Sequence, residues 1–183
     1  SLDEIAQTDP VNLLVTAAND ADMTIVLAGG GAGSSVGITA GNELTVAGID
    51  AATNVAGATA VTLTATANDV NVGAIDSNNG DVTITAGAQI LASSTIDAGT
   101  GDLALTSGAT GASVITGAVT ASGMTIAAGN DVTFNGGINA DAIVASGAGD
   151  VKVLGSTDAY VVNSEGLSGS LNAIFDADPG SLA

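Results

Sequence analysis

A repeat of 21 residues in the middle of the chain is the feature that most limits its fold. Units of this length bury their apolar side only by stacking on their neighbours, so a repeat predicts a solenoid. Met23 and Leu44 are 21 residues apart, as are Ile25 and Val46, so we expect the repeat to begin there. The segments that align without gaps are AVTLTATA (60–67), DVTITAGA (81–88), DLALTSGA (102–109) and GMTIAAGN (123–130).

Aliphatic and small polar residues alternate within each segment, which is the pattern of a half-buried strand. Val82 and Ile84 are expected to point inward, with Thr83 and Thr85 outward. A helix would need apolar residues at i, i+3 and i+4 instead. Weaker apolar pairs fill the rest of each coil and predict about three short strands per turn, hence a triangular cross-section. The expected fold is all-β, a right-handed parallel β-helix (β-solenoid) with about 21 residues per coil and roughly eight coils.

The two ends of the chain depart from this repeat and contain both of its prolines. The end strands of a solenoid have unpaired edges, which need caps or partners. We therefore expect the solenoid at 21–160, with a cap or subunit interface at 1–20 and another at 161–183. Self-association into a fibre or homo-oligomer follows from the same argument.

The corners between strands carry a recurrent Gly-Asp or Asn-Asp pair followed by an aliphatic residue. Glycine and asparagine tolerate the positive φ that a sharp corner requires, and the aspartate can bond to its own backbone there. The sequence therefore predicts that these pairs form the corners. They occur at Asn68-Asp69, Gly80-Asp81, Gly101-Asp102, Asn130-Asp131 and Gly149-Asp150.

The same aspartates are also candidate calcium ligands, because hard cations prefer carboxylate and carbonyl oxygens. GTGDLAL (99–105) and GAGDVKVL (147–154) partly match the Gly-rich calcium repeats of RTX proteins. Asp176 and Asp178 near the end are candidates for a cation bound between subunits. Calcium is the one cofactor that the sequence suggests, with candidate ligands Asp81, Asp102, Asp131 and Asp150.

Outward threonines are expected to form a ladder on one flat face. Regular threonine arrays on β-solenoids order water against ice in several antifreeze proteins, although threonine also simply suits exposed strand positions. Ala104 and Ala127 interrupt the array. The predicted ladder consists of Thr24, Thr45, Thr62, Thr64, Thr66, Thr83, Thr85, Thr106 and Thr125.

The composition excludes several functions. The chain has 19 acidic residues against a single base, Lys152, and contains neither His nor Cys. Nucleic-acid binding needs basic groups to displace counterions from phosphate. Without His or Cys, the usual general base, the common nucleophile pairs and most zinc sites are missing. We therefore expect no enzyme, no nucleic-acid partner and, since no apolar run is long enough, no membrane span.

Several repeats, among them GNELTVAG (41–48), NNGDVTITAGAQI (78–90), GTGDLALTSGA (99–109) and AGNDVTFNGGI (128–138), resemble those of filamentous-haemagglutinin-like exoproteins. The resemblance covers about residues 40–155. These exoproteins are large bacterial adhesins with right-handed β-helical shafts, exported by two-partner secretion. The resemblance implies an extracellular or cell-surface location, adhesion, and a cell-surface or glycan receptor.

The expected function is that of a secreted structural protein, a β-solenoid subunit or shaft of an extracellular fibre, biofilm matrix or adhesin. Two alternatives remain open at this point. One is an ice-binding β-solenoid that uses the threonine ladder, and the other is a polysaccharide-binding module.

Overall fold

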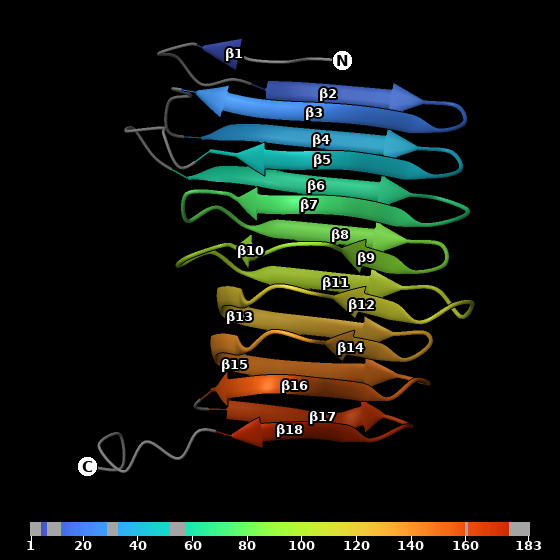
Figure 1. The fold of residues 1–183 in the computed structure, drawn as a ribbon, viewed down its shortest axis with the longest axis vertical. Coiled ribbons are helices and arrows are strands. Elements are labelled where there is room, and N and C mark those ends of the chain that lie inside the picture. Colours follow the sequence, from blue (N-terminus) through green and yellow to red (C-terminus); the bar gives the residue numbers. More distant parts are fainter. Residues whose placement is uncertain (1–4, 7–11, 29–32, 52–57, 160, 176–183) are drawn as a thin grey trace.

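The structure is a computed structural model, and it describes residues 5–6, 12–28, 33–51, 58–159 and 161–175. Its regular elements are all strands, and every pairing between them is parallel. The strands stack along the long axis of the molecule, from the N-terminal end to the C-terminal end (Figure 1). The predicted all-β parallel solenoid is confirmed, with about seven turns where roughly eight coils were expected.

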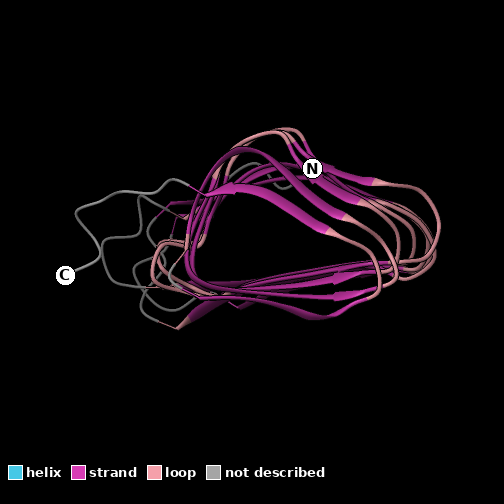
Figure 2. Cartoon of the chain, turned by 90° about the horizontal axis from the view of Figure 1, so that it is seen from below, coloured by secondary structure: helices cyan, strands magenta, loops and turns pink. Residues whose placement is uncertain are grey.

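Each coil contributes to two sheets, which we call the flat sheet and the arched sheet after their profiles in Figure 2. The flat sheet contains β2 (Asn12–Ala17), β4 (Ser34–Ala40), β6 (Thr59–Ala65), β8 (Val82–Ala86), β11 (Leu103–Ser107), the second halves of β13 (Val119–Ala128) and β15 (Ile138–Gly147), and β17 (Val161–Leu167). The arched sheet contains β1 (Ile5–Ala6), β3 (Ala21–Ala28), β5 (Leu44–Asp50), β7 (Val70–Asp76), β9 (Ile90–Ala92), β10 (Ile96–Asp97), β12 (Ser113–Ile115), β14 (Val132–Phe134), the first halves of β13 and β15, β16 (Val151–Asp158) and β18 (Leu171–Phe175).

The expected three strands per turn occur only in the middle coils. There the arched side is divided into two pieces, as in β9 and β10. In the coils before them, β5 and β7 each cross the arched side as one continuous strand. The nearer strands run right to left and the farther ones left to right while the chain descends, so the coil is right-handed (Figure 1), as parallel crossovers almost always are.

The register between coils follows the 21-residue step only in the middle of the chain. Val61, Val82, Leu103 and Met124 lie opposite one another in successive coils. The pairing predicted nearer the N-terminus is wrong, because Met23 lies opposite Val46 and not Leu44. Ile25 likewise lies opposite Ile49 rather than Val46, after a bulge. The early coils are longer than 21 residues, and the pairing of β3 with β5 contains a bulge.

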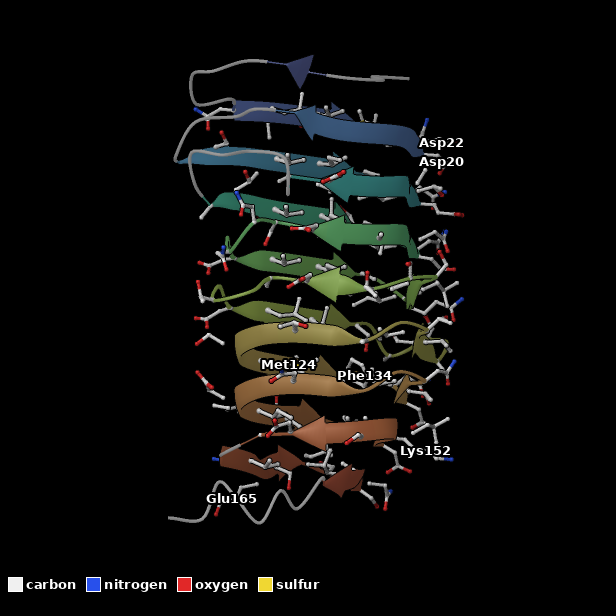
Figure 3. All side chains as sticks on the ribbon, turned by 60° about the vertical axis from the view of Figure 1, so that its left-hand side comes forward. Asp20, Asp22, Met124, Phe134, Lys152 and Glu165 are labelled. Carbon is white, nitrogen blue, oxygen red and sulfur yellow. The ribbon has the colours of Figure 1, made fainter. Side chains whose placement is uncertain are left out.

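The core consists of columns of inward aliphatic side chains, one residue from each coil. On β8 these are Val82, Ile84 and Ala86, each almost completely buried, as predicted. On the arched sheet Phe134 is fully buried, and Figure 3 shows it with Met124 inside the coil. Burial of each large aliphatic or aromatic side chain stabilises the fold by roughly 1.5–3 kcal/mol.

The predicted reason for glycine at the corners is wrong in part. Gly80 and Gly101 do not have positive φ. The positive values before Gly80 are at Asn78 and Asn79, and the one before Gly101 is at Gly99, two residues earlier. Glycine is needed at 80 and 101 because a Cβ there would overlap the backbone of the coil before, at Thr59 and at Gly80 respectively. Close stacking of the coils, rather than backbone conformation, therefore selects glycine at these two positions.

Candidate functional surfaces

The two ends of the solenoid differ from its middle in how well the core is covered. Leu13 and Val15 on β2 are only partly buried, as are Val162 on β17 and Leu171 on β18. The equivalent inward residues of the middle coils, such as Leu63, are fully buried. Among the described residues, β2 pairs along the flat sheet only with β4, and β17 only with β15. Within the described residues, the flat sheet therefore ends in strand edges with partly exposed apolar side chains, while on the arched sheet β1 pairs with the end of β3.

The described strands also extend the solenoid beyond the predicted range of 21–160. Strand β2 lies within the segment expected to be the N-terminal cap or interface, and β17 and β18 lie within the C-terminal one. All three continue the parallel ladders of the middle. The assignment of the end segments as caps or interfaces stays a prediction.

The four candidate calcium ligands lie at two different corners. Asp81 and Asp102 lie where the arched sheet leads into the flat sheet, and Asp131 and Asp150 lie where the flat sheet leads into the arched one. Within the described ranges, no group of three or more acidic residues is arranged to hold a metal ion. Calcium binding stays a prediction for these four, and Asp176 and Asp178 lie outside the described residues.

Each of these aspartates accepts a hydrogen bond from the coil that follows it, rather than from its own backbone as predicted. The amide of Asp102 donates to Asp81 Oδ1 at 2.9 Å, and the amide of Gly123 donates to Asp102 Oδ1 at the same distance. At the other corner the amide of Asp150 donates to Asp131 Oδ1 at 3.0 Å. The carboxylates therefore join successive coils where the backbone leaves one sheet for the other.

Other polar side chains also join successive coils at the corner where the flat sheet leads into the arched sheet. The amide of Gln89 donates to Asp69 Oδ1 at 3.2 Å, and its side-chain nitrogen donates to Oδ2 at 3.0 Å. Asn68 Nδ2 donates to Asn42 Oδ1 at 2.6 Å. The sequence signature identified Asn68 and Asp69 as corner residues, but Asn42 and Gln89 fall outside it. Their role becomes visible only once the coils are in register.

The outward side of the flat sheet carries a ladder of threonines, which we call the threonine face. We define it as two adjacent columns of outward positions. The first column contains Leu14, Gly37, Thr62, Thr83, Ala104, Thr125 and Val144, and the second contains Thr16, Thr39, Thr64, Thr85, Thr106, Ala127 and Ser146. The second column holds threonine in every coil from Thr16 to Thr106.

The structure brings six residues of the predicted ladder together and places the other three elsewhere. Thr62, Thr64, Thr83, Thr85, Thr106 and Thr125 all lie on the threonine face. Thr24 and Thr45 belong to β3 and β5 of the arched sheet, and Thr66 lies in a turn. Sequence reasoning missed Thr16 and Thr39, because the coils around them are longer than 21 residues.

The threonine face has no charged residue at any of its fourteen positions, although the chain has a net charge of −18. The outward surface of the arched sheet differs: Asp50, Asp76 and Asp97 are stacked in successive coils. Asp20, Asp22 and Lys152 point away from the coil (Figure 3). A depression of about 320 Å³ interrupts the threonine face around Ala104, and the carboxylates of Asp81 and Asp102 help to line it.

Comparisons with known proteins give no relative: no protein-family model, curated protein or solved structure matches the chain. The similarity of the repeats to filamentous-haemagglutinin-like proteins is therefore not supported by a family match. In the described part of the chain, no helix is long and apolar enough to cross a membrane.

Proposed function

We propose that the chain is an extracellular structural protein, a solenoid segment of a fibre or adhesin shaft that stacks end to end with another copy. The observation that carries this proposal is the incomplete coverage of the core at both ends, where Val15 and Val162 are partly exposed. A further coil of the same kind would complete both the backbone pairing and the burial.

Leu13 on β2 and Val162 on β17 are the two ends of one inward column. Leu13, Val15 and Ala17 of β2 repeat the inward pattern of the coils that follow, such as Val36, Ile38 and Ala40. A copy placed with its β2 on β17 would continue this column, and its Val15 would lie beside the bulge at Ser164 and Glu165. Because the net charge of −18 opposes this association, we expect stacking to strengthen as salt screens the repulsion.

The proposal assigns the protein no catalytic activity and places it outside the cell. The resemblance of the repeats to secreted adhesins supports that location, and the scarcity of basic residues suits it, since trypsin-like proteases have only Lys152 to attack. Adhesion to a cell-surface or glycan receptor is the role that such a shaft would serve. Ice binding, the second function expected from the sequence, would use the threonine face and so does not compete for the ends.

The test is assembly of the purified chain. Sedimentation velocity and electron microscopy across protein and salt concentration should show rods that lengthen by whole copies. In the variant Val15→Lys a charge enters the exposed end of the core, so we expect loss of stacking. Leu14→Lys is the matched control, because Leu14 is on the same strand but points outward and is 78% exposed. A strict monomer under all conditions, or equal assembly of both variants, would refute the proposal.

A further inference from the structure

We propose that the threonine face binds ice, with Thr64, Thr83, Thr85 and Thr106 at the centre of the contact. The proposal is independent of end-to-end stacking, because the face lies on the side of the rod. It begins from the register, which places Thr64, Thr85 and Thr106 directly above one another in consecutive coils.

The threonines form a regular two-dimensional array. Adjacent coils repeat a hydroxyl about every 4.8 Å, and alternate residues of one strand, such as Thr83 and Thr85, are roughly 6.6 Å apart along it. β-branched side chains have few χ1 rotamers in a strand, so the positions of the hydroxyls are restricted before any ligand arrives. Each hydroxyl donates one hydrogen bond and accepts others, and its methyl group leaves a small apolar patch beside it. Such an array can hold ordered water at fixed positions.

The charge of the threonine face is the second point. Its fourteen positions include no carboxylate, and the nearest carboxylates belong to the adjoining column, two residues before Thr83 and Ala104. A charged group binds its own hydration shell, which would compete with the lattice of ice. Asp81 and Asp102 lie at the margin of the face, each with one oxygen bonded to the next coil. An uncharged lattice is therefore the partner whose chemistry fits this surface.

Other occupants fit the face less well. A neutral polysaccharide is normally held by aromatic stacking, and none of the fourteen positions is aromatic. A second copy could pack its own threonine face against this one. The threonine hydroxyls of both copies would then have to give up their hydrogen bonds to water, which costs free energy. We therefore commit to ice as the ligand and treat the second copy as an outcome of the test.

The experiment measures thermal hysteresis and inhibition of ice recrystallisation by the purified chain. We expect both activities in the unmodified protein and loss of most of both in Thr85→Lys, because a charge then lies in the middle of the array. Thr85→Val keeps the shape of the side chain and removes only the hydroxyl, so we expect a smaller loss. Circular dichroism and thermal unfolding verify that each variant folds.

Thr45→Lys is the matched control, because Thr45 is an outward threonine of the arched sheet. It adds the same charge and should keep full activity. Absence of both activities at millimolar concentration would overturn the proposal, as would equal activity of Thr85→Lys and Thr45→Lys. A dimer that Thr85→Lys dissociates, in a protein without activity on ice, would show that the face binds a second copy instead. The assays are repeated on Val15→Lys, so that failure of stacking and failure of ice binding are separated.

Discussion

The flat and arched sheets share one core and one set of coils, yet their outward surfaces differ. Inward, both contain stacked aliphatic residues that are almost fully buried, such as Ile84 on the flat sheet and Ile75 on the arched one. Outward, the flat sheet carries uncharged threonines, whereas the arched sheet carries Asp76 and Asp97 in consecutive coils. The inward columns are therefore alike on the two sheets, whereas the outward columns differ in charge.

The sheets also differ in regularity. Strands of the flat sheet from β6 to β11 follow one register without a bulge, whereas its last pairing, β15 with β17, is shifted between Val144 and Ser146. The arched sheet is divided into short strands in its middle, and its pairing between β16 and β18 is shifted between Lys152 and Ser156. The regular part of the flat sheet is therefore the segment from β6 to β11.

The largest expected effect tests whether inward positions alone determine stability. Phe134 is fully buried, so Phe134→Ala should lower the free energy of unfolding by about 3–5 kcal/mol. Thr133→Ala, on the same strand but outward, should change it by less than about 0.5 kcal/mol. Urea unfolding monitored by circular dichroism measures both. Similar losses in the two variants would break the distinction between inward and outward columns.

A second prediction sharpens the contrast between corners and strands. Gly108→Ala should cost about 1–3 kcal/mol, because its Cβ would overlap the carbonyl oxygen of Gly87 in the coil before. Gly37→Ala, on the threonine face, should be tolerated, since its Cβ would meet the movable end of Leu14 at 3.2 Å and the backbone oxygen of Leu13 only at 3.9 Å. Thermal unfolding of the two variants measures the difference in their stability. Equal stability would contradict close backbone stacking at the corner.

A third prediction concerns the carboxylates that join the sheets. Asp102→Ala leaves the amide of Gly123 without its acceptor and should cost about 1 kcal/mol in unfolding free energy. Asp102→Asn keeps a side-chain oxygen and should cost less. If the two variants lost equal stability, the charge rather than the hydrogen bond would be the cause. Chemical denaturation at a fixed salt concentration measures the unfolding free energy of both variants.

The smallest expected effect tests the acidic column of the arched sheet. Asp76→Asn removes a charge between Asp50 and Asp97 and keeps an oxygen for the amide of Asn78. Stability should rise by a few tenths of a kcal/mol at low salt, and the gain should vanish at about 1 M salt, where charges are screened. Melting curves at the two salt concentrations measure it. A gain that persists at high salt would exclude repulsion as its source.

The sequence predicted the fold well where the coil length is constant. From Val61 to Ile126 the 21-residue step identified the inward columns and the centre of the threonine face correctly. It failed near Met23, because longer coils hide the register when sequence spacing is the only guide. It missed Thr16 and Thr39 for the same reason. The ends could not be predicted from the repeat, since exposure of Val15 depends on what stacks on it.

The corner hydrogen bonds give the rod a direction. Asp81, Asp102, Asp131 and Asp150 all accept from the coil that comes later in the chain. Each finished coil therefore presents acceptors to the one that follows, so coil formation can proceed vectorially from the N-terminus as the polypeptide emerges. Copies added to such a rod must all point the same way, and the two tips of a growing filament would be chemically distinct.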